Sequence, residues 1–295
     1  AQSGSERTVA SQLRHLITDK NNHCGQIKYL RGLQDEGVGP AVRQRGCTSV
    51  REGVPGRTAT DWRASLVKLV TFGETMVQYN ARYVGRYREE GEYLEDCAGA
   101  ESNVAVDLRR LGVPGMEITW VSRLGDDAPG DLILTELTGR IRVFASKYVG
   151  QHTGISYLNH YKDGEHVKTY HRKDSAASRL TFQEVKPHLE ESDLLHLTGI
   201  TPALSETCRE TVFDALRYAV SSNLPVSLDL NFRPQLWKAS EARSVFDEML
   251  EFSSILKLGY DEAETVWAKG WSPAEYARHF QSMNGGLVVL TLGSS

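Results

Sequence analysis

The segment 229–234, which reads DLNFRP, combines three polar side chains that could bind an anion. Asp229 supplies a carboxylate, Asn231 an amide and Arg233 a guanidinium, at the end of a stretch whose apolar residues predict a buried strand. A guanidinium fork matches the oxygens of a phosphate, so Arg233 is a candidate phosphate ligand. The alternative interpretation of the same residues is a helix cap with a surface ion pair.

A tyrosine and an arginine two residues apart, Tyr170 and Arg172, end the stretch 154–172, which is rich in aromatic and β-branched residues. Along a strand, residues i and i+2 lie on one face, so the two side chains would present a hydroxyl and a cation to the same ligand. This pairing suits a ligand with a carboxylate and hydroxyl groups. An ordinary pair of surface side chains is the alternative.

Two predicted helix starts carry further candidates. Gly99 and Asn103 open a helical pattern, and free backbone N–H groups with an amide there could hold ligand hydroxyls. Glu262 begins a second helix directly after the sequence LKLG. Its carboxylate could orient water around a magnesium ion, or it could simply favour the helix dipole.

The elements that must position these residues alternate between strand and helix from residue 66 onward. The predicted strands are 66–73, 117–125, 194–199, 225–231, 254–259 and 287–293. The predicted helices lie at 99–112, within 125–139, at 205–222, at 240–252, near 262–268 and from the capping box at Ser272 to about Gly285. This alternation predicts a doubly wound, mostly parallel α/β sheet. Ligands of such sheets bind beyond the carboxyl ends of the strands, where most of the candidates fall.

A hairpin interrupts the alternation. Asp163 and Gly164 tolerate the positive φ angles of a type I′ turn, and aromatic and β-branched residues flank them. We therefore expect a small sheet outside the main layer, built from strands within about 76–96 and 150–173.

Composition excludes several classes of protein. The 295 residues carry a formal net charge of −4 with a pI near 6.2, which gives no global basic excess for nucleic acid. No apolar run is long enough for a membrane span, and the start lacks a signal-peptide core, so a cytoplasmic location is expected. The four cysteines lie far apart without a CxxC pair, which argues against a zinc site or a disulfide framework.

Residues 1–65 differ from the rest of the chain. They carry ten basic and six acidic side chains, against 24 and 32 in the remainder, and have little periodicity. We expect an extension that is disordered or foreign to the domain that begins at residue 66. A basic arm for nucleic acid or a partner is the alternative, but no known basic–aromatic module is present.

Taken in order, the motifs resemble those of the ribokinase-like (PfkB) sugar kinases. They are GE at 73–74, GAESNVA at 99–105, GDDAPG at 125–130, LTGITPALS at 197–205, SLDLNFRPQLW at 227–237 and LKLGYDEAE at 256–264. The combination of GAE-x-N, Y-x-R, LTGITPAL and D-x-N-x-R-x-x-L-W is similar to the 2-keto-3-deoxygluconate kinase branch. The resemblance covers the chain from about residue 66 to its end.

The resemblance implies a doubly wound domain with a small β lid, which often pairs with the lid of a second subunit. It also implies transfer of the γ-phosphoryl group of ATP, with Mg²⁺, to the 6-hydroxyl of a sugar acid. Carried over by position, the expected sugar ligands are Gly99, Asn103, Tyr170 and Arg172. The expected nucleotide-side residues are Asn231, Arg233, Gly259, Thr291 and Gly293, with Glu262 linked to Mg²⁺ through water.

The chain departs from the family pattern at four positions. Gly259 replaces a usual Asn or Ser, Ala98 replaces a glycine, and His171 replaces an aromatic residue. Ser156 falls where the branch has a lid tyrosine, for which Tyr157 would compensate.

The largest departure is a motif that residues 1–295 do not contain. The catalytic aspartate of the family lies in a GAGD motif, and the resemblance places that motif beyond Ser295. We therefore expect no catalytic residue within this sequence, a C-terminally truncated domain, and no kinase activity from the chain alone.

Two other functions compete with a sugar-acid kinase. A kinase for a neutral sugar, such as a fructokinase, would share the fold but would have less need for a cation at Arg172. A non-catalytic sugar-binding remnant would share the pocket and lack the base.

Overall fold

The computed structural model describes residues 66–162 and 164–293. The expectations for residues 1–65, for Asp163 in the hairpin turn and for a catalytic motif beyond Ser295 lie outside the described residues, as does Ser295 itself. Of the cysteines, Cys97 and Cys208 are described, and both are free thiols. Among the described residues, no helix is both long and apolar enough to cross a bilayer.

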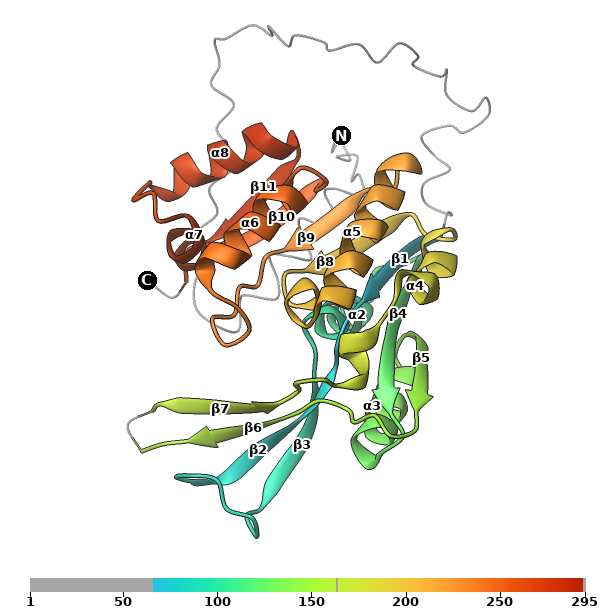
Figure 1. The fold of residues 1–295 in the computed structure, drawn as a ribbon, viewed down its shortest axis with the longest axis vertical. Helices are drawn as coiled ribbons and strands as arrows, with labels where there is room; N and C mark the ends of the chain where they lie inside the picture. The colour runs from blue at the N-terminus through green and yellow to red at the C-terminus, as the bar shows by residue number, and fades with distance from the viewer. Residues whose placement is uncertain (1–65, 163, 294–295) are drawn as a thin grey trace, which may run out of the picture.

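A seven-stranded sheet forms the main layer, in the order β11-β10-β9-β8-β1-β4-β5, and every neighbouring pair in it is parallel (Figure 1). The predicted doubly wound, mostly parallel α/β fold is therefore confirmed. Its strands are β1 (Val67–Phe72), β4 (Met116–Gly125), β5 (Arg142–Tyr148), β8 (Leu194–Thr198), β9 (Val226–Asp229), β10 (Ile255–Gly259) and β11 (Leu287–Thr291).

Helices bury both faces of this sheet, because neighbouring strand residues point to opposite sides. Leu69 belongs to the core cluster that includes residues of α2 and α3, and the next residue, Val70, belongs to the cluster that includes residues of α4 to α8. The helices are α2 (Ala100–Arg110), α3 (Ala128–Thr138), α4 (Phe182–Leu189), α5 (Glu206–Ser221), α6 (Ala239–Leu250), α7 (Tyr260–Trp267) and α8 (Pro273–Asn284). Two 3₁₀ turns, η2 (Ala176–Arg179) and η3 (Thr201–Ala203), complete the main domain.

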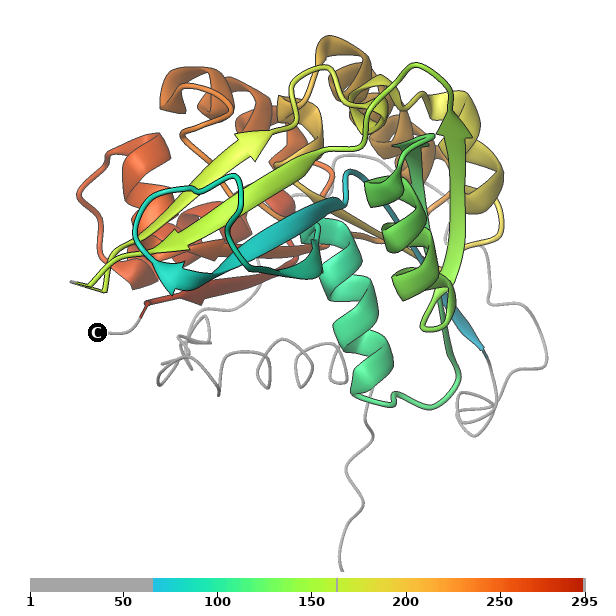
Figure 2. The same cartoon turned by 90° about the horizontal axis from the view of Figure 1, so that it is seen from below.

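A second sheet of four strands, here called the lid sheet, projects from the carboxyl end of β1 (Figures 1 and 2). Its order is β3-β2-β6-β7, and β2 runs parallel to β6 while the outer pairs are antiparallel. The strands are β2 (Met76–Val84), β3 (Tyr93–Ala98), β6 (Ile155–His160) and β7 (His166–His171). The hairpin of β6 and β7 has the sequence position that the aromatic pattern predicted.

Its turn is longer than the two-residue turn that Asp163 and Gly164 suggested. The ladder ends at His160 and resumes at His166, and the amide of Tyr161 donates to the carbonyl of Glu165. Gly164 has a φ of +85°, a conformation that glycine adopts without strain. Gly164 therefore lies in the connection between β6 and β7, as the sequence predicted.

Two elements were absent from the sequence prediction. Strand β5 is an edge strand with a mixed sequence, RVFASKY, and alternate residues are exposed, so no apolar run marks it. Helix α4 has only eight residues and contains Pro187. The helix nevertheless begins with a capping box of Thr181 and Glu184, and Val185 and Leu189 are buried in the core.

Candidate functional site

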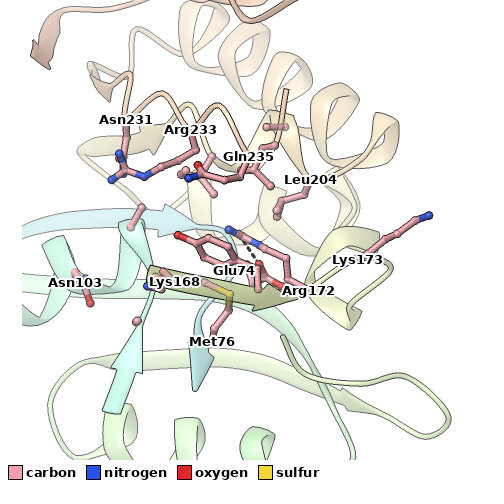
Figure 3. A pocket seen from close by; sticks show the side chains of 17 residues that line it. Glu74, Met76, Asn103, Lys168, Arg172, Lys173, Leu204, Asn231, Arg233 and Gln235 are labelled. Atoms are coloured by element: carbon pink, nitrogen blue, oxygen red, sulfur yellow. Dashed lines mark ion pairs between the residues drawn. The ribbon is translucent and has the colours of Figure 1, made fainter. Parts of the chain in front are cut away.

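A pocket of about 500 Å³ lies between the lid sheet and the carboxyl ends of the main-sheet strands (Figure 3). Six predicted ligand residues from three separate segments meet in it, although they span more than 130 positions in the sequence. The predicted residues that line the pocket are Gly99, Asn103, Tyr170, Arg172, Asn231 and Arg233. The other lining residues are Glu74, Met76, Ala98, Ala100, Lys168, Lys173, Ile200, Ala203, Leu204, Gln235 and Leu236.

One face of β7 supplies the lid side of the pocket. Lys168, Tyr170 and the following Arg172 recur at a period of two and all line the cavity. The Lys168 ammonium lies 5.3 Å from the centre of the Tyr170 ring, and the Arg172 guanidinium carbon lies 5.7 Å from it. The prediction named Tyr170 and Arg172 but missed Lys168, which the same alternation places on the same face.

Arg172 is held by a buried carboxylate that the sequence analysis did not single out as a site residue. Its Nη2 lies 2.5 Å from Oε2 of Glu74, whose side chain is fully buried. Oε1 of Glu74 accepts a hydrogen bond from the hydroxyl of Ser175 at 2.5 Å. Glu74 lies two residues after the end of β1, so the end of this strand fixes the guanidinium against the lid. The Nε of Arg172 is buried and has no hydrogen-bond partner among the described residues.

A second buried carboxyl group, Glu101, lies in the first turn of α2. Its Oε1 accepts hydrogen bonds from the hydroxyls of Thr198 and Thr201, each at 2.7 Å. Burial raises the pKa of Glu101, although these two hydrogen bonds and the charge of Arg172 oppose the shift. The carboxyl group therefore ties α2 to the end of β8 and to η3, behind the pocket.

The start of α2 opens onto the pocket. Gly99 is the residue before the helix, and its carbonyl accepts the amide of Asn103 at 2.9 Å. A Cβ on Gly99 would lie 2.6 Å from the carbonyl oxygen of Glu74 and from two hydroxyls, so only glycine fits there. Asn103 is exposed on the first turn, where its amide borders the cavity.

The loop after β9 supplies the opposite side. Asn231 has a φ of +43°, a left-handed conformation that is uncommon outside glycine and turns the chain sharply at the strand end. Arg233 is exposed, and its guanidinium makes one weak hydrogen bond within the described residues, from Nη1 to the carbonyl of Phe232 at 3.3 Å. This guanidinium is therefore available to a ligand.

Glu262 supports this loop through the backbone. Its Oε1 accepts the amide of Phe232 at 2.8 Å, and its Oε2 accepts the amide of Gly259 at 2.6 Å. Burial raises the pKa of Glu262. The carboxylate thus caps α7 and holds the Asn231–Arg233 turn at the same time. Its link to magnesium through water stays a prediction.

The remaining predicted residues lie outside the pocket, at the next strand ends. Gly259 ends β10 and pairs in register with Thr291 of β11, and Gly293 follows with a φ of +71°. The structure therefore divides the predicted residues into a pocket group of six and an adjacent group consisting of Gly259, Glu262, Thr291 and Gly293.

Acidic side chains near the pocket are already engaged. Both carboxylate oxygens of Asp229 accept a hydrogen bond from the ammonium of Lys257, each at 3.1 Å. Within residues 66–162 and 164–293, no group of three or more His, Cys, Asp or Glu side chains could hold a metal ion directly. Glu74 is the one carboxylate that the described residues contribute to the pocket lining, and it is paired with Arg172.

Tyr157 does not replace the tyrosine expected at Ser156. Ser156 pairs in register with Tyr170, whereas Tyr157, one residue on, belongs to the other face. There it stacks on Tyr79 at 5.1 Å and packs against Tyr87 and Tyr93. The expectation that Tyr157 compensates is therefore wrong, because neighbouring strand residues cannot share a face.

Comparison with known proteins gives consistent matches. The sequence model described as "pfkB family carbohydrate kinase" matches residues 67–295. A 2-dehydro-3-deoxygluconokinase of Bacillus subtilis is 37% identical over 173 residues, which are 57% of this chain and 52% of that protein. The chain thus spans about half the length of this relative.

Two solved structures are similar to the described fold. The PfkB protein from Polaromonas sp. JS666 superposes with a TM-score of 0.70 at 30% identity and covers 77% of each chain. A 2-dehydro-3-deoxygluconokinase from Thermotoga maritima gives a TM-score of 0.69 at 26% identity, over 77% of this chain and 71% of that one.

Proposed function

Because this chain belongs to the pfkB family of carbohydrate kinases, we propose that it forms the sugar-binding part of an enzyme that phosphorylates a sugar acid with ATP. The proposed substrate is 2-keto-3-deoxygluconate and the proposed product is its 6-phosphate. Relatives that carry the name 2-dehydro-3-deoxygluconokinase support this substrate class. ATP follows from the kinase family, and Mg²⁺ would enter with the nucleotide phosphates.

The observation that carries the proposal is the pairing of Arg172 with buried Glu74 on a face that also presents Tyr170. The ion pair fixes the guanidinium beside the cavity, where it can donate to a carboxylate oxygen of the ligand. Tyr170 and the amide of Asn103 would contact ligand hydroxyls, and the start of α2 would supply backbone donors near Gly99.

On the nucleotide side, we propose that Arg233 and Asn231 approach the transferring phosphoryl group, because charge stabilisation is the main contribution to this reaction. Gly259, Thr291 and Gly293 would border the nucleotide. Both oxygens of Glu262 accept backbone amides, so any contact of Glu262 with Mg²⁺ would run through water. The described residues that line the pocket offer no unpaired carboxylate as a general base, since Glu74 is paired with Arg172.

The test is calorimetric titration of the 295-residue chain with 2-keto-3-deoxygluconate and with fructose. We expect the sugar acid to bind more tightly, and the double variant Glu74→Gln/Arg172→Ala to lose about 10- to 100-fold of that affinity, as for one charge-assisted hydrogen bond. The double change avoids leaving a buried carboxylate unpaired. Arg82→Ala is the matched control, because this lid arginine pairs with exposed Glu92. Tighter binding of fructose would favour the neutral-sugar alternative.

A coupled assay with MgATP and the sugar acid completes the test. We expect binding without turnover from this chain, because proton removal needs a base within hydrogen-bond reach. Turnover that Asp229→Asn abolishes would contradict the assignment, since it would identify a base among the described residues.

A further inference from the structure

The basic side chains of the pocket differ in how their charge is balanced. Arg172 lies 2.5 Å from the carboxylate of Glu74, so this pair brings little net charge to a ligand. Lys168 and Arg233 also line the pocket, and no ion pair joins either of them to an acidic residue within the described ranges. The uncompensated positive charges of the pocket therefore come from Lys168 on the lid, Arg233 on the main domain and Lys173 at the rim.

Lys168 lines the same side of the pocket as Arg172. It lies two residues before Tyr170 and four before Arg172, on the face of β7 that lines the cavity. Its ammonium lies 5.3 Å from the Tyr170 ring centre, within the range of a cation–π contact that orients the side chain. Figure 3 shows Lys168 on the lid side and Arg233 across the pocket from it.

The surroundings penalise the charge of Lys168 while no anion is present. Its side chain is half-buried, and burial lowers the pKa of Lys168, with further lowering by the charges of Arg172 and Arg233. An anion bound between these cations would attract all three and would favour the charged form of Lys168. The charge of Lys168 should therefore contribute to the binding of an anion in this pocket.

We propose that Lys168 is a specificity-determining residue that selects ligands carrying a carboxylate. Arg172, with its charge offset by Glu74, supplies directed donors, and Lys168 supplies the net positive charge that separates a sugar acid from a neutral sugar. The inference rests on the proposed sugar-acid substrate. It assigns the charge discrimination to a residue outside the Y-x-R motif.

Calorimetric titration with two matched ligands tests this role. One ligand is 2-keto-3-deoxygluconate, and the other is 3-deoxyfructose, in which a hydroxymethyl group replaces the carboxylate. For Lys168→Met we expect an affinity loss of about 10- to 100-fold for the acid and of less than about 3-fold for the neutral analogue. Lys168→Arg should bind the acid within about 3-fold of the parent chain.

Lys173→Met is the charge-matched control. Lys173 lies at the rim of the same pocket, it is exposed, and its side chain extends away from the cavity, so this variant should bind both ligands like the parent chain. Titration with MgATP should give the same affinity for the parent chain and for Lys168→Met. Circular dichroism and melting curves establish that each variant is folded.

The outcomes separate this inference from the proposed function. If the parent chain does not bind the sugar acid, both fail. If it binds the acid but Lys168→Met weakens acid and neutral analogue equally, or weakens MgATP instead, the role of Lys168 is wrong and the proposed substrate stands. If Lys173→Met weakens binding of the sugar acid as much as Lys168→Met does, the discrimination comes from general attraction by surface charge, and the specific role of Lys168 is wrong.

Discussion

At the scale of single residues, Glu101 is a buried acid. Among the described residues, no cationic side chain forms a hydrogen bond with its carboxyl group. Its Oε2 has no hydrogen-bond partner in that part of the chain, and burial raises its pKa. At a pH between the unfolded and the folded pKa, Glu101 is therefore protonated in the folded chain and ionised in the unfolded chain. Stability from this group is complete below the unfolded pKa and is lost as the pH rises through the folded pKa.

We predict that Glu101→Gln becomes increasingly stabilising relative to the parent chain as the pH rises from about 5 to 8. The glutamine still accepts from Thr198 and Thr201 but cannot ionise. Melting curves across this range measure the difference. Parallel curves for the two proteins would show that the carboxyl group is ionised throughout or makes no contribution.

Glu275 offers a control of opposite sign. It accepts hydrogen bonds from the hydroxyl and the amide of Ser272 at an exposed helix start, and these bonds lower its pKa. The contribution of Glu275 to the free energy of unfolding is present above the unfolded pKa and is lost as the pH falls through the folded pKa. Glu275→Gln should therefore be most destabilising near neutral pH and should converge with the parent chain in acid.

At the scale of elements, α4, α7 and α8 each have a first-turn glutamate that accepts the backbone amide of the residue before the helix. The glutamates of α7 and α8 differ in their surroundings. Glu275 serves only the start of α8, at Ser272. Glu262 serves the start of α7 and also holds the amide of Phe232 in the loop after β9. The second bond couples a helix cap to the loop that carries Asn231 and Arg233.

We predict that Glu262→Ala lowers the free energy of unfolding by at least about 2 kcal/mol, because two partly buried amides lose one acceptor. Hydrogen–deuterium exchange in residues 230–236 should also rise. Glu275→Ala should cost less and should leave exchange in 230–236 unchanged. If both variants changed hydrogen–deuterium exchange in residues 230–236 equally, Glu262 would act only as a helix cap and would not hold this loop.

At the scale of the whole molecule, the lid sheet carries several large apolar side chains in contact with solvent. Leu94 on β3 is 61% exposed, and Val84 and Tyr87 are 50% and 53% exposed. Such side chains on a four-stranded sheet with two free edges are suited to cover by another protein surface. We propose that a second copy of the chain provides it, as the family resemblance implies for the lid.

We predict that the chain sediments as a dimer and that Leu94→Asp shifts it to monomer, because burying a charge in a contact between two lid sheets is costly. Val149→Asp is the matched control, since Val149 is 86% exposed in the turn after β5, away from the lid sheet. Analytical ultracentrifugation measures both. A parent chain that is monomeric at high concentration would contradict the proposed pairing.

The sequence by itself determined the features that follow from local periodicity. Apolar runs such as 287–293 predicted the strand β11 (Leu287–Thr291), and Ser272 with Glu275 predicted the start of α8. These patterns are readable because strand alternation, helical spacing and capping involve residues only a few positions apart. Parallel topology then placed Asn231 and Arg233 at the carboxyl edge of the main sheet. The lid sheet and the start of α2 bring the other four predicted residues to the same pocket.

Only the tertiary structure decided which charges remain for a ligand. Ser175 and Glu74 lie 101 positions apart, yet their hydrogen bond and the contact of Glu74 with Arg172 decide that this arginine is already paired. The same holds for Glu262, whose second amide partner, Phe232, is 30 positions away. Sequence spacing can assign a side chain to a face of a strand, but the balance of charge in a pocket depends on contacts between segments that only folding brings together.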